Sequence, residues 1–214
     1  MHHDTVLVVA GGGSAPITRE LLPPADAVVA ADGGVDLAHE LGLCVQVVVG
    51  DLDSASPSGL AAAEAAGARV VRHPRDKDET DLELALDEAA ALGPRRLLVL
   101  GVDGGRLDHL LGALLLLGAE RYAPFEVDAR LGRARVAVIR GEREIAGETG
   151  ELVSLLALHG QAEGVATDGL LYPLRRETLL AGSSRGISNV FATPRARVSV
   201  ERGVLLALCP GGEG

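Results

Sequence analysis

Two aspartates separated by one leucine, Asp51 and Asp53 in GDLDS, directly follow an apolar run of the sequence. If this segment stays extended, both carboxylates project to the same side. Magnesium in proteins is held by a few carboxylates together with substrate phosphates. The spacing therefore predicts a metal and phosphate site, and the alternative is a turn in which the aspartates cap the next helix.

A second acidic segment, RDKDETD at residues 75–81, follows the next apolar run. Thr80 and Glu83 have the spacing of a capping box, which predicts that a helix begins at Asp81. Asp81 would then lie in the first turn, where the helix dipole favours a carboxylate. The remaining acids must be compensated by arginine, lysine or a metal ion, so we expect Asp81 to complete the site of Asp51 and Asp53.

A third polar segment, GGRLDH at residues 104–109, places a guanidinium two residues before a carboxylate. Arg106 is suited to bidentate contact with phosphate. Gly104 and Gly105 would let backbone amides approach a ligand closely. The alternative for Arg106 and Asp108 is a local ion pair at the start of a helix.

The first glycine-rich segment, GGGSAP at residues 11–16, only partly fits a dinucleotide-binding fingerprint. Gly11, Gly13 and the later Asp32 match the pattern, but Pro16 occupies the position of the third glycine. Nor is a Walker A sequence present. We expect a loop that cradles phosphates rather than an NAD site.

These polar segments follow strand-like apolar runs that alternate with helical patterns over the first 120 residues. Runs rich in valine and leucine, without polar alternation, are typical of a parallel sheet covered on both faces. We therefore predict a doubly wound α/β domain, whose ligands bind beyond the carboxyl ends of the strands. The predicted strands are residues 5–12, 26–34, 45–54, 68–76 and 95–105, and the predicted helices are residues 35–42, 58–67, 80–93 and 107–120.

After about residue 124 the pattern changes to short apolar runs separated by glycine. Such runs predict a small antiparallel all-β sandwich with little helix. We place the boundary between Tyr122 and Arg133, with an α/β domain at residues 1–123 and a β-sandwich domain at residues 130–214.

Composition narrows the class of partner. The chain has 214 residues and a formal net charge of −10, with no basic stripe, so we expect no nucleic-acid partner. The apolar run near residue 115 is too short to span a bilayer, and the start lacks a signal peptide. Cys44 and Cys209 lie in strand-like surroundings and are expected to be buried thiols. A cytoplasmic location follows as the prediction.

Taken in order, the segments GDLDS, DKDETDLELAL, GGRLDH, GLLYPL and SSRGISN resemble those of the thiamine pyrophosphokinase family. The resemblance covers nearly the whole chain. It implies transfer of the pyrophosphoryl group of ATP to the hydroxyl of thiamine, giving thiamine diphosphate and AMP. It also implies an ATP- and magnesium-binding catalytic first domain, a thiamine-binding second domain, and a homodimer with active sites at the subunit interface.

Carried onto this sequence, the resemblance implies a role for each motif residue. Mg²⁺ ligands would be Asp51, Asp53 and Asp81, and catalysis would add Arg106 and Asp108, with Asp108 near the attacking hydroxyl. ATP and its phosphates would contact Asp32, Lys77, Thr80 and Arg106. Thiamine would contact Tyr172, Ser188 and Asn189, with the Tyr172 ring stacking on the substrate.

Two departures from the family pattern concern substrate contacts: Ala113 stands where the family has Asn, and Leu180 and Ala181 where a Trp is usual. Two other functions are alternatives to thiamine diphosphokinase. One is a related hydroxymethylpterin diphosphokinase, and the other is a nucleotide- or thiamine-binding sensor without catalysis. A sensor would not need Asp108.

Overall fold

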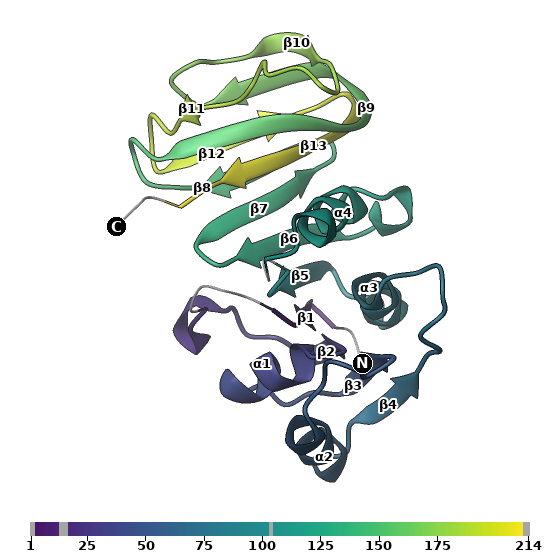
Figure 1. Ribbon diagram of the computed structural model, residues 1–214. Coiled ribbons are helices and arrows are strands. Elements are labelled where there is room, and N and C mark those ends of the chain that lie inside the picture. Colours follow the sequence, from purple (N-terminus) through teal and green to yellow (C-terminus); the bar gives the residue numbers. More distant parts are fainter. Residues whose placement is uncertain (1–2, 13–16, 103–104, 212–214) are drawn as a thin grey trace. The chain divides into compact units, whose positions relative to one another are not determined.

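The computed structural model describes residues 3–12, 17–102 and 105–211, which form a mixed α/β fold (Figure 1). The chain divides into two compact units. The first comprises Met1–Leu116 with Pro124–Gly132, and the second comprises Leu117–Ala123 with Arg133–Gly214. The units are thus interleaved along the chain, whereas the sequence was divided at a single point.

The first unit is built on a parallel sheet with the strand order β4-β3-β2-β1-β5-β6. Its inner strands are buried on both faces, which is why their sequences are continuously apolar. The sixth strand, β6, comes from the region that the sequence assigned beyond the first domain. The strands are β1 (Thr5–Ala10), β2 (Ala27–Ala31), β3 (Val47–Gly50), β4 (Arg69–Arg72), β5 (Arg96–Leu100) and β6 (Glu126–Leu131).

Helices connect the strands of this sheet, as the sequence pattern predicted. Residues of α1 and α2 share one core cluster with Leu7 and Val9 of β1, so both helices cover the same face. Helix α3 packs on β1, β2 and β3 from the other side (Figure 1). The helices are α1 (Gly34–Glu40), α2 (Pro57–Ala65), α3 (Asp81–Ala91) and α4 (Leu107–Leu117), with short 3-10 helices at Arg19–Leu21 and Glu120–Tyr122.

The second unit is an antiparallel β structure organised around one long strand, β9. The first half of β9 pairs with β13, and its second half pairs with β12 and β10. Apolar side chains from these strands form a separate core that includes Leu155, Val198 and Leu205. The strands are β7 (Ala134–Ile139), β8 (Glu142–Ala146), β9 (Leu152–Asp168), β10 (Arg175–Leu179), β11 (Asn189–Val190), β12 (Arg195–Ser199) and β13 (Arg202–Cys209).

The two free cysteines differ in their surroundings. Cys209 is buried on β13, as expected. The expectation for Cys44 is wrong, because this residue is exposed in the loop before β3. Its apolar neighbours Leu43 and Val45 lie in the same loop between α1 and β3, so the run is not one buried strand. None of the described helices has the length and apolar character needed to cross a membrane.

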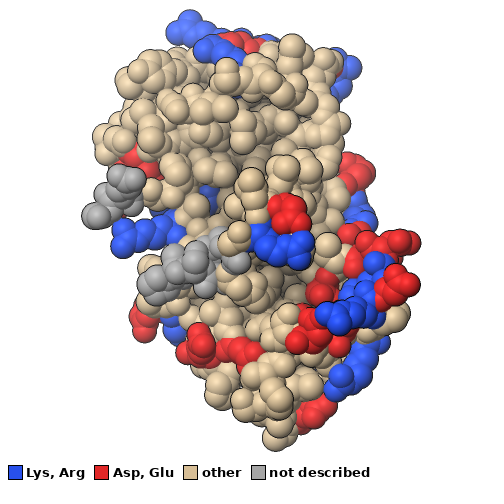
Figure 2. Space-filling model, viewed as in Figure 1, with Lys and Arg blue, Asp and Glu red and all other residues tan. Residues whose placement is uncertain are grey.

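Charged and uncharged surfaces are distributed unevenly. In the view of Figure 2, acidic and basic side chains are interspersed over the part of the first unit near β4 and α3. The visible face of the second unit is broadly uncharged (Figure 2). Several large apolar side chains of that unit are exposed, namely Leu152, Leu171, Tyr172, Leu180 and Ile187.

Candidate active site

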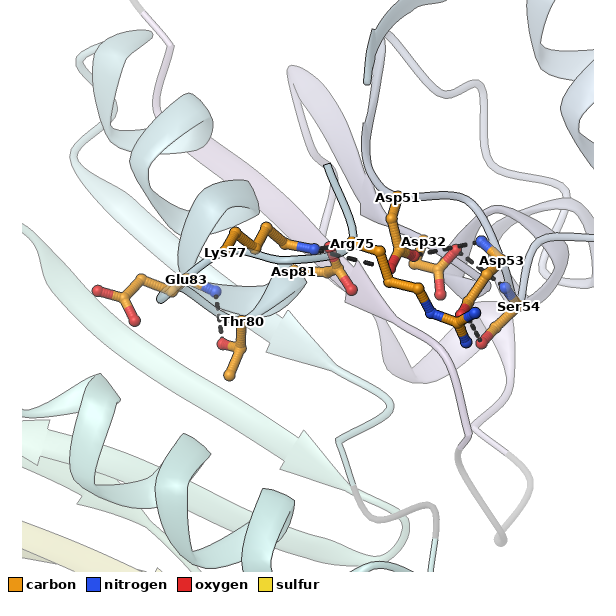
Figure 3. A network of polar contacts seen from close by, with 9 residues as sticks. All are labelled: Asp32, Asp51, Asp53, Ser54, Arg75, Lys77, Thr80, Asp81 and Glu83. Carbon is orange, nitrogen blue, oxygen red and sulfur yellow. Dashed lines mark hydrogen bonds and ion pairs between the residues drawn. The ribbon is translucent and has the colours of Figure 1, made fainter. Parts of the chain in front are cut away.

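Three carboxylates meet at the carboxyl ends of β2 and β3 (Figure 3). β2 and β3 are neighbours, and the N–H of Asp32 donates to the carbonyl of Val49 at 2.9 Å. Oxygen atoms of Asp32, Asp51 and Asp53 all lie within 4.8 Å of one another. The sheet order therefore adds Asp32, which the sequence assigned to ATP binding, to the pair Asp51 and Asp53.

The backbone that presents these carboxylates is turned, not extended. Leu52 has φ +62° and Asp32 has φ +45°, both in the left-handed region. The expectation that GDLDS continues as an extended strand is wrong, because β3 ends at Gly50 and the chain reverses at Leu52. Such conformations cost free energy and are found where a site requires them.

Hydrogen bonds from the following serine hold this turn in place. The N–H of Ser54 donates to Asp32 Oδ1 at 3.3 Å, and Ser54 Oγ donates to Asp53 Oδ1 at 3.0 Å. The N–H of Asp53 donates to Asp51 Oδ1 at 3.3 Å. The carboxylates are thus oriented by neighbouring backbone and hydroxyl groups of the chain.

The electrostatics of the group favour a cation. Burial, followed by the charges of Asp81 and Asp51, raises the pKa of Asp32 above its ordinary value, although Ser54 opposes the change. Carboxylates this close repel one another unless a positive charge lies between or beside them.

Lys77 supplies one such charge (Figure 3). Its ammonium lies 3.0 Å from Asp81 Oδ1 and 3.8 Å from Asp51 Oδ2, and only 10% of its side chain is exposed. Burial lowers the pKa of Lys77, but the charges of Asp81, Asp51 and Asp32 outweigh it and raise the pKa. Lys77 therefore stays protonated and is held against the carboxylates.

Asp81, the first residue of α3, lies beside this group and contacts Lys77. The side chain of Thr80 accepts a hydrogen bond from the N–H of Glu83 at 3.2 Å, which confirms the predicted N-cap. Gly50 allows this approach, because a Cβ there would lie 2.9 Å from Asp81 Oδ1 and the residue has φ +145°. Among the described residues, Asp81 Oδ1 is buried and accepts no hydrogen bond, so its contact is the ion pair with Lys77.

These residues fit a magnesium ion. The donors are all carboxylate oxygens, which suit a hard divalent cation. They converge within reach of a single ion, and a nearby buried oxygen of Asp81 lacks a hydrogen bond. Asp81 itself is paired with Lys77 and lies outside the group of three.

Arg106 and Asp108 form an exposed pair at the start of α4. Arg106 Nη2 donates to Asp108 Oδ2 at 2.6 Å and Nε donates to Oδ1 at 3.3 Å. The hydrogen bond from Arg106 lowers the pKa of Asp108 to about 2. Within the described residues no ion pair joins them to the carboxylates of β2 and β3. Gly104 and, in the first glycine-rich loop, Gly13 and Pro16 lie outside the described residues.

The residues expected to contact thiamine lie in the second unit. Tyr172 is 58% exposed in the loop between β9 and β10. Ser188 has φ +57°, and its N–H donates to Ser154 Oγ at 3.1 Å. Asn189 is buried beside them, on β11.

Two contributions were not foreseen from the sequence. Asp32 joins the carboxylate group because β2 lies beside β3, and sheet order is the signal that would have found it. Arg75 Nη2 donates to Asp53 Oδ2 at 2.6 Å, although Arg75 is highly exposed. Sequence spacing does not predict this contact, because it joins residues 22 positions apart.

Two family models match successive parts of the chain. Residues 18–126 match the family model described as thiamin pyrophosphokinase, catalytic domain, which is about half of the chain. Residues 138–205 match the model described as thiamin pyrophosphokinase, vitamin B1 binding domain. The chain belongs to the thiamin pyrophosphokinase family. The resemblance of its motifs is thereby confirmed.

Individual members of this family are similar over nearly their whole length. The thiamine pyrophosphokinase of Bacillus subtilis is 26% identical over 95% of this chain and 97% of the relative. A crystal structure of the Bacillus subtilis protein has a TM-score of 0.82 and 25% identity, covering 98% of this chain and all of that one. The Geobacillus thermodenitrificans structure has a TM-score of 0.78 and 27% identity over 98% of each chain.

Proposed function

We infer that this chain is a thiamine diphosphokinase, which transfers the pyrophosphoryl group of ATP to the hydroxyl of thiamine and releases AMP. The observation that carries this is the matching of both family models, catalytic and vitamin B1 binding, in order along one chain. The hydroxymethylpterin diphosphokinase and the sensor are not favoured, because both matched models are those of the thiamin enzyme.

The first unit has the groups that such a transfer needs. The reaction depends mainly on positioning and on neutralising negative charge, so no protein nucleophile is required. We propose that Asp32, Asp51 and Asp53 hold Mg²⁺, with Asp81 beside them, and that the bound ion neutralises charge on the phosphates. Lys77 adds a fixed ammonium next to the same position.

Arg106 and Asp108 at the start of α4 would contact the phosphate that is transferred and the hydroxyl that accepts it. Arg106 is proposed to leave Asp108 for a phosphate oxygen, which its exposed position allows. Asp108, with a pKa of about 2, is a weak base and would orient the thiamine hydroxyl by accepting its hydrogen bond. The side chain of Thr80 caps α3. We therefore propose that ATP is contacted at the N-terminal end of this helix, where Thr80 lies.

The test is direct. The protein is incubated with ATP, Mg²⁺ and either thiamine or a hydroxymethylpterin, and AMP and the diphosphorylated alcohol are measured. We expect product with thiamine and little with the pterin. Asp53→Asn should lower turnover at least ~100-fold, while Asp87→Asn, a substitution on an outer position of α3, serves as the matched control. Product with the pterin alone would overturn the assignment.

We further propose that the enzyme is a homodimer whose partner supplies the thiamine site. The exposed apolar residues of the second unit, including Leu171 and Leu180, support this because such side chains are often covered in an assembly. An Asp81→Ala chain and a chain with Ser188→Ala and Asn189→Ala should each be nearly inactive. Mixed dimers would regain one intact site. Mixed dimers without activity would contradict a shared site. The cytoplasmic location stays a prediction.

A further inference from the structure

Asn189 is one of the few polar residues in the buried interior of the second unit, at 3% exposure. Its Oδ1 accepts hydrogen bonds from the N–H of Tyr172 at 3.0 Å and from the N–H of Val190 at 2.9 Å. Its Nδ2 donates to the carbonyl of Tyr172 at 2.8 Å. The side-chain amide thus binds both polar groups of the Tyr172 backbone.

The segment that carries Tyr172 is fixed at its two ends. Leu170 and Leu174 are buried, and the backbone N–H of Thr167 donates to the carbonyl of Leu174. Between them, residues 171–173 are exposed. The contacts of Asn189, together with the N–H of Leu171, which donates to the carbonyl of Val190 at 2.9 Å, hold the middle of the segment, where Tyr172 is exposed.

We propose that Asn189 is a positioning residue, which sets the Tyr172 ring for the acceptor and does not itself contact it. Two hydrogen bonds occupy Oδ1 and a third uses one N–H of Nδ2, so only the second N–H of this buried amide is left for a ligand. The inference rests on the proposed function insofar as Tyr172 is taken to bind thiamine.

Asparagine suits this position for a chemical reason. Its carboxamide both donates and accepts, as a paired peptide group would. Aspartate could accept from the same two N–H groups, but its other oxygen would face the carbonyl of Tyr172. Alanine would remove both hydrogen bonds to the backbone of Tyr172, whose N–H and carbonyl are partly buried at these contacts, and each lost bond costs free energy.

The first measurement does not depend on enzymatic function. Amide hydrogen exchange is followed in the free protein for the wild type, Asn189→Ala and Thr167→Val. Thr167→Val is the matched control, because it removes one side-chain hydrogen bond, at 2.9 Å, from the buried end of the same segment. We expect Asn189→Ala to speed exchange at Tyr172 at least ~10-fold and the control to leave it nearly unchanged. Equal loosening by both variants, or none, would overturn the inference.

The second measurement uses turnover. Asn189→Ala and Asn189→Asp should raise KM for thiamine roughly 10-fold while KM for ATP changes less than roughly twofold, given the usual size of a lost hydrogen bond. A variant combining Asn189→Ala with Tyr172→Ala should be no worse than Tyr172→Ala alone, because Asn189 acts through Tyr172. Losses that multiply would indicate direct contact with thiamine and contradict the proposal.

The two measurements separate the two ideas. If the wild type forms no thiamine diphosphate but Asn189→Ala loosens Tyr172, the proposed function fails and the structural role of Asn189 stands. If turnover is normal in the wild type and exchange at Tyr172 is unchanged by Asn189→Ala, the positioning role is wrong and the enzymatic function stands.

Discussion

Replacing Asp32 by asparagine should stabilise the protein without metal and abolish its response to metal. Asparagine keeps the size of the side chain, keeps an oxygen that can accept from the N–H of Ser54, and tolerates the left-handed backbone at φ +45°. The substitution therefore isolates the charge. Alanine would also remove the hydrogen bond and would be strained at this φ.

The magnitude follows from the spacing of the carboxylates. Two unit charges 4.8 Å apart, the limit within which the oxygens of this group lie, repel by about 1 kcal/mol in water and about 3.5 kcal/mol at an effective dielectric constant of 20. Lys77 offsets part of this repulsion. We expect Asp32→Asn to raise the free energy of unfolding by about 1–2 kcal/mol at pH 7 without metal.

The sign agrees with the titration of Asp32. Its pKa is raised in the folded protein, so the folded state binds this proton more tightly than the unfolded state. Protonated Asp32 contributes its whole share of the folding stability below pH 3.8, the ordinary pKa of the group. This contribution is lost as the pH rises through the raised pKa of the folded protein. The advantage of Asp32→Asn should accordingly vanish when the pH falls below about 4.

The assay is urea unfolding of both proteins in EDTA and in Mg²⁺. An ion at 100 times its dissociation constant adds about 2.7 kcal/mol to the wild type, so the order of stability should reverse. Asp26→Asn is the matched control. Asp26 accepts from two backbone N–H groups at the start of β1, which lower its pKa, so this variant should lose stability in both buffers. A less stable Asp32→Asn in EDTA, or equal stabilisation by Mg²⁺, would refute the reasoning.

Three other predictions concern charged groups of the first unit. Lys77→Met removes the partner of Asp81 and should lower the free energy of unfolding in EDTA by about 2 kcal/mol in urea titrations; an unchanged midpoint would contradict the pairing. Gly50→Ala brings a Cβ to 2.9 Å from Asp81 Oδ1 at φ +145° and should cost about 1–3 kcal/mol by thermal unfolding. The hydrogen bond from Arg106 lowers the pKa of Asp108 to about 2, so the ion pair is lost as the pH falls through that value. Arg106→Gln removes the guanidinium and should return the pKa of Asp108 toward 3.8, as measured by an NMR titration.

The sequence was sufficient for features that depend on near neighbours. The Thr80 and Glu83 spacing located the start of α3, because an N-cap is a contact between residues three apart. Continuous valine and leucine runs identified buried parallel strands. The order of the motifs along the chain was enough to identify the family. Each of these signals is contained within a short stretch of chain.

Features that depend on distant residues needed the tertiary structure. Asp32 joins Asp51 and Asp53 only because β2 pairs with β3, and a strand order is not encoded locally. A turn lies where the sequence predicted a strand, because β3 ends at Gly50 and Leu52 adopts a left-handed conformation. The sixth strand, β6, reaches the first sheet by pairing with β5, from across α4 in the sequence.

Asn189 shows the difference most clearly. The sequence marked it as a motif residue, and a motif carries no information about which way a side chain points. Folding buried its amide against the backbone of Tyr172, 17 residues earlier. Local sequence predicted which residues carry the chemistry of this protein. Long-range strand pairing and burial decided which of these residues lie close together. Such contacts join distant segments, and the number of residues between two segments does not tell how far apart they lie in the folded protein.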